Sequence, residues 1–224
     1  MSQFISDFLW RLVLLAPPIL MALTVHEASH ALVAWLRGDP TAKQAHRLSL
    51  NPIRHLDLAG TLVFFVTAWF GAGFGWAKPV PVDGRRLHNP RRDMIWISAA
   101  GPVSNLAFAV LISLVLAGLI HLGLFAEYAL WKWFLGEMMI LGITVNVILA
   151  FFNLIPLPPL DGSGILTGLL SPRAALRYQQ FSRYGFVILL ALIFLPRWLP
   201  GLPNIIAYLV LYPAQAVIDL LLPL

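Results

Sequence analysis

Two histidines and a glutamate stand inside an apolar run near the start of the chain. His26, Glu27 and His30 form the sequence HEASH, which fits the pattern H-E-x-x-H. On a helix, residues four apart share one face, so both imidazoles could bind one metal ion. Zinc binds imidazole nitrogen well, and a catalytic zinc usually has three protein ligands and a water. Glu27, beside the first ligand, could take a proton from that water.

The surroundings of this motif strengthen the metal hypothesis. Residues 8–36 form an apolar run long enough to cross a bilayer, and the motif lies within it. Ionisable side chains in a membrane helix are costly, and they usually mark a functional site whose partners should be sought. We therefore interpret His26, Glu27 and His30 as part of a zinc site in or near the membrane.

A catalytic zinc site needs a third protein ligand, and we predict that it is Asp161. This residue lies in NLIPLPPLDGSG, just after the proline-broken end of an apolar segment at 128–157. His26 is about 18 residues, or roughly 27 Å, into its own segment. Both motifs lie at the same depth, toward the cytoplasmic side, only if segment 58–77 does not cross the membrane. An Asp-Gly turn is the alternative for Asp161. The remaining histidines lie in basic loops or near the far side: His46, His55, His88 and His121.

The composition indicates an integral membrane protein. The 224 residues are 59% hydrophobic and only 11% charged, against roughly 25% charged in an average soluble domain. The net charge of +5 fits basic cytoplasmic loops, so we expect a lipid bilayer and no nucleic acid as partner. Cysteine is absent, which excludes disulfide and thiol chemistry. The polar stretches are too short for a second core, so we predict one membrane-embedded domain over 1–224, with a core at 8–170 and C-terminal helices at 184–222.

We predict an all-α fold with five to six transmembrane segments. The apolar segments run approximately over 8–36, 58–77, 94–124, 128–157, 184–199 and 202–222. Lys and Arg cluster after the first, second and fourth of these, which places all three regions in the cytoplasm by the positive-inside rule. Only Arg11, Lys132 and Arg197 are left for the far side.

This charge pattern conflicts with a full crossing by segment 58–77. If it crossed, the basic loops on its two sides would lie on opposite faces of the membrane. The segment holds several glycines and β-branched residues. We therefore predict a re-entrant segment near 58–82, with a β-hairpin as one form it could take, covered by protein or lining a cavity. A complete six-span count is the alternative.

Two asparagines could donate a hydrogen bond to the developing oxyanion or contact the substrate. Asn153 opens the N-x-x-P-x-P sequence, with a helix C-cap as its alternative role. Asn105 lies in SAAGPVSNLAFA, where an interhelical hydrogen bond is the alternative. Small residues on both sides lead us to expect that segment 94–124 packs against the HEASH helix. The stretch WAKPVPV, residues 76–82, could pair with an unwound substrate strand or be an ordinary proline-rich loop.

Five motifs in order resemble the site-2 protease family of intramembrane zinc metalloproteases. They are HEASH, NPIRHLDLAGTL, FGWAKPVPV, GPVSNL and FNLIPLPPLDG. The resemblance covers about residues 20 to 170 and fits the compact form that lacks an inserted PDZ or CBS domain. It implies that His26, His30 and Asp161 bind one zinc ion per chain and that Glu27 is the catalytic base. Asn153 resembles the substrate-contacting asparagine of the family.

The expected function is hydrolysis of peptide bonds in or near transmembrane segments of membrane protein substrates. The resemblance further implies regulated intramembrane proteolysis in the plasma or inner membrane of a prokaryote, with the active site toward the cytoplasm. A zinc-binding membrane protein without protease activity is the main alternative, although it would not need Glu27. A metal transporter is disfavoured because segments 94–124 and 184–222 are too apolar to line a polar path.

Overall fold

The computed structural model describes residues 2–69, 75–125, 129–199 and 201–222. Within these ranges the chain is helical and contains no β-strand. The α-helices are α1 (Ser2–Leu36), α2 (Thr41–Gln44), α3 (Leu58–Trp69), α4 (Pro90–His121), α5 (Leu130–Asn153), α6 (Asp161–Leu169), α7 (Pro172–Ser182), α8 (Gly185–Trp198) and α9 (Tyr212–Leu221). Two 3₁₀ turns, Pro52–Arg54 and Gly84–Arg86, and a π turn, Ala207–Leu211, complete the described structure.

Within the described ranges, three helices are long and apolar enough to cross a membrane. They are α1, over Leu12–Leu36, then α4 and α5. A fourth span would be made by α7 and α8 together, which are bent by 60° at a short break. The described part of the chain is therefore that of an all-helical membrane protein, but the predicted five to six spans are not confirmed. Hydropathy reports how apolar a segment is, but a span also needs a helix of about 20 residues. Helix α3 has 12 residues and α8 has 14, so both are too short by themselves.

The segment predicted to be re-entrant contains a helix. Residues Leu58–Trp69 form α3, and residues 70–74 lie outside the described part of the chain, so the β-hairpin near 58–82 is not confirmed. Leu56 and Ala77 form an isolated antiparallel bridge, and the N–H of Lys78 donates to the carbonyl of His55 over 2.8 Å. The chain that follows α3 therefore pairs with the residues that precede α3.

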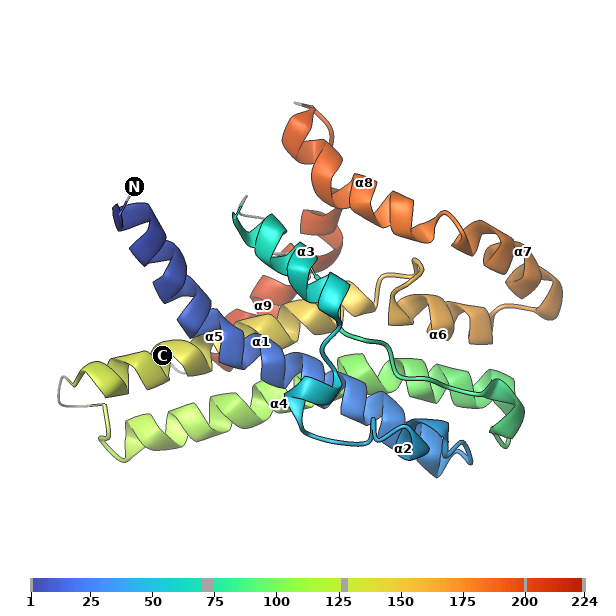
Figure 1. The fold of residues 1–224 in the computed structure, drawn as a ribbon, viewed down its shortest axis with the longest axis horizontal. Helices are drawn as coiled ribbons and strands as arrows, with labels where there is room; N and C mark the ends of the chain where they lie inside the picture. The colour runs from blue at the N-terminus through green and yellow to red at the C-terminus, as the bar shows by residue number, and fades with distance from the viewer. Residues whose placement is uncertain (1, 70–74, 126–128, 200, 223–224) are drawn as a thin grey trace.

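Helix α4 lies at the centre of the packing. It contacts α1, α5 and α6, and α1 also contacts α5 (Figure 1). The predicted packing of segment 94–124 against the HEASH helix is confirmed. Small residues allow this close approach: Ala28 and Ala31 on α1 and Gly101 on α4 are buried. A separate apolar core joins α4, α5 and α9 through buried residues that include Ala109, Ile143 and Ala214.

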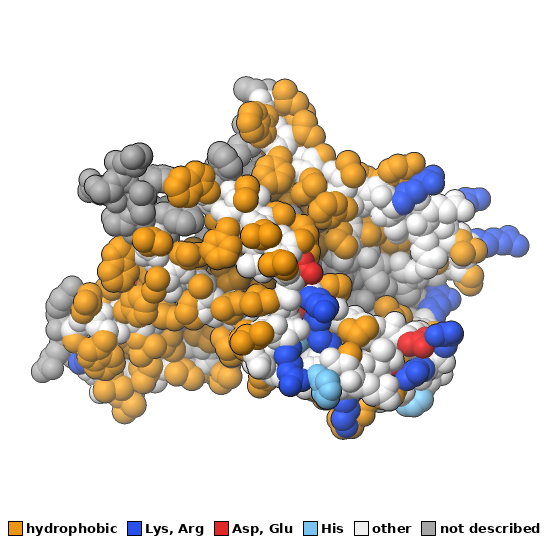
Figure 2. All heavy atoms as spheres, viewed as in Figure 1, with side chains coloured by type: hydrophobic (Ala, Val, Ile, Leu, Met, Phe, Trp, Pro, Cys, Tyr) orange, Lys and Arg blue, Asp and Glu red, His pale blue; other side chains and the backbone are white. Residues whose placement is uncertain are grey.

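Polar and apolar side chains are segregated over the surface. Figure 2 shows hydrophobic side chains over most of the face in view, and Lys and Arg gathered at the end that holds α2 and α7 in Figure 1. Large apolar side chains on α3 and α4 are exposed, among them Leu58 at 78% and Leu114 at 66%. Exposure of this extent on a soluble protein would be unfavourable, whereas it is expected of a surface that faces lipid.

Candidate metal centre

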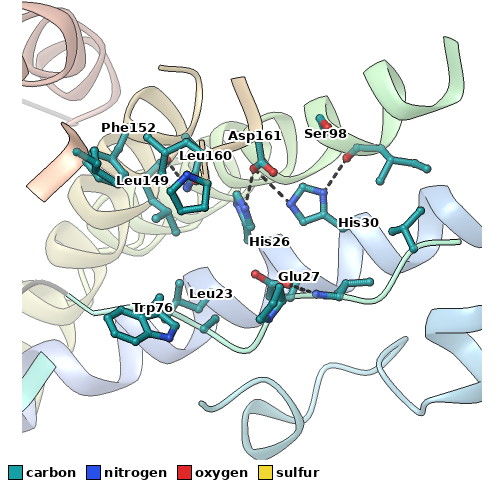
Figure 3. A pocket seen from close by; sticks show the side chains of 18 of the residues that line it. Leu23, His26, Glu27, His30, Trp76, Ser98, Leu149, Phe152, Leu160 and Asp161 are labelled. Carbon is teal, nitrogen blue, oxygen red and sulfur yellow. Dashed lines mark hydrogen bonds and ion pairs between the residues drawn. The ribbon is translucent and has the colours of Figure 1, made fainter. Parts of the chain in front are cut away.

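A cavity of about 440 Å³ opens beside the C-terminal half of α1. Its wall combines α1, the extended chain after α3, α4, the end of α5, the start of α6 and α8. His26, Glu27, His30 and Asp161 all line it (Figure 3). The cavity therefore brings together two motifs that lie more than 130 residues apart in the sequence.

Three side chains converge in this cavity as potential metal ligands. The Nε2 atoms of His26 and His30 lie 3.0 and 3.3 Å from Oδ2 of Asp161. One ligand atom from each residue lies within 4.8 Å of the others. In a tetrahedral site with zinc bonds near 2.0–2.1 Å, ligand atoms lie roughly 3.3 Å apart. The observed separations are close to that value, so the three residues lie near enough to hold a zinc ion.

The hydrogen bonds of the two imidazoles support the same conclusion. Nδ1 of His30 lies 2.7 Å from the carbonyl oxygen of Ile97, which can only accept. Nδ1 of His26 lies 2.6 Å from Oδ1 of Asn105. Each Nδ1 therefore carries a proton, and in a neutral imidazole Nε2 then presents a lone pair. Oδ2 of Asp161 is buried, and its close polar neighbours are these two Nε2 atoms. Three lone-pair atoms facing one another repel unless a cation lies between them, so the donor set fits zinc.

The position of Asp161 is set by the start of α6. Asp161 is the first residue of that helix, where the helix dipole stabilises a carboxylate. Gly162 lets α6 approach the end of α5 closely, because a Cβ there would lie 2.3 Å from the carbonyl oxygen of Leu154. At the far end of α6, Nε of Arg91 donates to the carbonyl of Gly168 over 2.8 Å. These contacts fix the depth at which Asp161 meets the histidines.

Glu27 lies across the cavity from Asp161, with the imidazole rings between them in Figure 3. Its Oε2 accepts a hydrogen bond of 3.2 Å from the N–H of Val80. Val80 belongs to the extended chain at 76–82, which the bond from Lys78 ties to His55. The carboxylate that the sequence predicts as a base is thus held at the cavity wall by a backbone donor.

The other end of the extended chain is anchored to the end of α1. The N–H of Asp83 donates to Oδ2 of Asp39 over 2.7 Å, and Thr41 donates its N–H and hydroxyl to Oδ1. Burial alone would raise the pKa of Asp39, but these hydrogen bonds hold it below its ordinary value. Asp39 is therefore a carboxylate at neutral pH and keeps residues 76–82 against the cavity.

The two predicted asparagines occupy different positions. Asn153 lines the cavity, and its amide nitrogen donates to the carbonyl of Leu149 one turn earlier. Asn105 is fully buried on α4, outside the cavity wall, and bonds to His26. The remaining histidines do not join the ligand group in the described part of the chain. His55, for example, is buried with Nε2 at 2.7 Å from the carbonyl oxygen of Ser49.

Sequence reasoning missed two kinds of contributor to this site. The N–H of Val80 and the carbonyl of Ile97 are backbone groups, and no residue type marks them. Asn146, which bonds to Asn105, could have been found, because it is a polar residue in the middle of the apolar segment that becomes α5.

Gly101 gives a direct test of this geometry. A Cβ on Gly101 would lie 2.5 Å from Nε2 of His30 and from Cε1 of His26. We expect Gly101→Ala to displace the imidazoles and weaken zinc binding by more than about 10-fold, the scale of a disturbed ligand shell. The matched control is Gly118→Ala on the same helix, where a Cβ meets nothing within 4 Å. Zinc titration of both purified variants is the measurement, and equal affinities would contradict the assignment of the site.

Comparisons with known proteins agree with the site. The sequence profile of peptidase family M50 matches residues 115–196. "Putative zinc metalloprotease YwhC" of Bacillus subtilis is 40% identical over 196 residues, covering 88% of this chain and 87% of that protein. "Putative zinc metalloprotease Rip2" of Mycolicibacterium smegmatis is 32% identical over 185 residues, covering 80% and 67%. No solved structure was found to match. The chain therefore belongs to peptidase family M50, the site-2 protease family of zinc metalloproteases.

Proposed function

We propose that this metalloprotease is an intramembrane-cleaving enzyme that hydrolyses peptide bonds in or near transmembrane segments of membrane proteins. The observation that carries the proposal is the location of the cavity. His26, Glu27 and His30 lie inside α1, which is long and apolar enough to cross a membrane. A substrate bond must therefore reach the ligand group from within or beside the bilayer. Zinc held by His26, His30 and Asp161 is the proposed cofactor.

The chain's own groups divide the work of peptide hydrolysis. Zinc would supply Lewis acidity toward the attacking water and the scissile carbonyl. Glu27 takes one proton from the water at its carboxylate and delivers it to the nitrogen of the breaking C–N bond. The hydroxide equivalent remains on the carbonyl carbon, so the products are a carboxylic acid and an amine. Asn153, at the cavity wall, is placed to contact the substrate backbone.

The extended chain at 76–82 is the proposed contact for an unwound substrate strand. Trp76, Ala77, Pro79, Val80 and Val82 line the cavity. Lys78 and Val80 donate their N–H groups to His55 and Glu27, and Pro79 and Pro81 have none. A substrate strand along the remaining edge would therefore bond to carbonyl oxygens of this chain, which is a restricted form of β-augmentation.

We further propose that segment 58–77 enters and leaves the same face of the membrane. The bridge between Leu56 and Ala77 supports this, as does the length of α3, whose 12 residues reach only about 18 Å of the roughly 30 Å of hydrocarbon. The positive-inside rule then assigns that face, and the cavity near it, to the cytoplasm. The bacterial relatives support a prokaryotic cell.

Accessibility labelling of single cysteines tests this topology, since the native chain has none. Gln44→Cys and Arg85→Cys, both at exposed positions, should react with an impermeant reagent from the cytoplasmic side. Leu130→Cys, 66% exposed at the start of α5, is the control and should react from the other side. Labelling of Gln44→Cys and Arg85→Cys from opposite sides would contradict the proposal and favour six spans, because segment 58–77 would then cross between them.

The activity itself is tested with the full chain in lipid vesicles and a panel of single-pass reporter proteins. We expect cleavage mapped by mass spectrometry to fall within or next to the reporter's transmembrane segment. A zinc chelator should abolish cleavage, and added zinc should restore it. Cleavage confined to reporter loops far from the membrane would show that the enzyme is a metalloprotease of another type.

A further inference from the structure

Three side chains from three helices form a hydrogen-bonded chain that ends on a proposed zinc ligand. Asn146 of α5 lies 2.7 Å from Asn105 of α4, which lies 2.6 Å from Nδ1 of His26 on α1. Asn105 and Asn146 are fully buried and His26 is 4% exposed. The proposed reaction does not use Asn146, and this position is deep within apolar helices, where polar side chains are costly without a specific role.

The direction of this chain is set at its far end. The backbone carbonyl of Gly142 can only accept, so the amide nitrogen of Asn146 must face it, over 2.8 Å. The amide oxygen of Asn146 then faces Asn105 and accepts from its amide nitrogen. That same nitrogen donates its second proton to the carbonyl of Ala22 over 3.1 Å. Both protons of the Asn105 amide are thereby used.

With its nitrogen engaged twice, Asn105 must present its oxygen to His26. An amide oxygen can only accept, so Nδ1 of His26 must carry a proton. A neutral imidazole carries one proton, and Nε2 is then left with its lone pair toward Asp161. Ligating histidines commonly donate their second N–H to an outer partner in this way, which fixes the tautomer and the ring orientation.

We propose that Asn146 and Asn105 are positioning residues that hold His26 in its metal-binding tautomer. The two amides act in series: Asn146 orients Asn105, and Asn105 orients the imidazole. His30 needs no such device, because the backbone carbonyl of Ile97 performs the same task. The inference rests on the proposed zinc site, but it concerns metal affinity and not the choice of substrate.

The test measures zinc affinity of the full chain in detergent by competition with a chelator. Asn105→Leu and Asn146→Leu remove the bonds at similar volume and should each weaken zinc binding by about 10- to 100-fold. Asn146→Asp should restore most of the affinity. Burial favours the protonated form of a carboxyl, and in that form its O–H donates to Gly142 while its carbonyl accepts from Asn105.

The matched control is Thr144→Val, two residues away on α5. Its hydroxyl bonds only back to the carbonyl of Ile140 at 2.9 Å, so this variant should bind zinc like the wild type. Thermal unfolding of the metal-free proteins separates a positioning role from a packing role. We expect Asn146→Leu and Thr144→Val to unfold at the same midpoint temperature, while only Asn146→Leu loses zinc affinity. Absorption of bound Co²⁺ should also change in the Leu variants and return in Asn146→Asp.

Two results would overturn the inference. One is wild-type zinc affinity in Asn146→Leu, and the other is an affinity loss that Asn146→Asp does not recover. Either result leaves the proposed function intact as long as the wild-type chain binds zinc. Absence of zinc binding by the wild type would instead refute the proposed function itself.

Discussion

Glu27→Gln should leave zinc bound and lower the rate of reporter cleavage by about 10²- to 10⁴-fold, which is the usual contribution of a general base. Glutamine keeps the size of the side chain and can still accept the hydrogen bond that Val80 donates. It cannot accept the proton of the attacking water. The variant should therefore retain the cavity and the metal while losing the chemical step.

The measurement pairs zinc content with single-turnover cleavage of a transmembrane reporter. Glu137→Gln is the matched control, because Glu137 lies on α5 away from the cavity lining. That variant should cleave at the wild-type rate. If Glu27→Gln with zinc in place also cleaved at that rate, the role of Glu27 would be wrong. A zinc-loaded wild type that cleaves none of the reporters would instead favour a zinc-binding protein without protease activity.

Asp161→Ala should remove both zinc and activity. The variant keeps the two imidazoles of α1 but loses the carboxylate oxygen that lies 3.0 and 3.3 Å from them. Two neutral ligands hold zinc far more weakly than the three of a catalytic site. Zinc content should fall from about one ion per chain toward the background, and reporter cleavage should become undetectable.

Metal analysis after dialysis, with Asp219→Ala as control, makes this prediction specific. Asp219 is an acidic residue of α9 that does not line the cavity and whose carboxylate accepts a hydrogen bond from Gln215. Its replacement should therefore change neither the zinc content nor the rate of reporter cleavage. Full zinc content in Asp161→Ala would assign the third ligand to another residue. Among the described residues no other group of three His, Asp or Glu side chains lies close enough to compete.

The sequence determined those features that depend on local geometry. The spacing of His26 and His30 places both rings on one face of a helix, and in the structure their centroids lie 4.7 Å apart. The apolar runs at 8–36, 94–124 and 128–157 appear as α1, α4 and α5. Helical periodicity and bilayer-length hydrophobicity act over short stretches of chain, so they can be recognised without knowing the fold.

Other predictions depended on how far an apolar run continues as one helix. Segments 184–199 and 202–222 are apolar enough for a membrane, but prolines and a π turn divide the chain there into short helices. Segment 58–77 carries β-branched residues, yet its first part is helical. Hydropathy and intrinsic propensity are weak guides to length and type of element, because interactions with neighbouring segments override them.

Only the tertiary structure decided how the site is completed. Asp161 meets the histidines because Gly162 allows α6 to start against the end of α5, and because Gly101 leaves room for the imidazoles beside α4. The partners of Glu27 and His30 are backbone groups of Val80 and Ile97, which carry no residue-specific signal. Relative depth and rotation of helices arise from close packing between segments far apart in the chain, and no pattern within one segment encodes them.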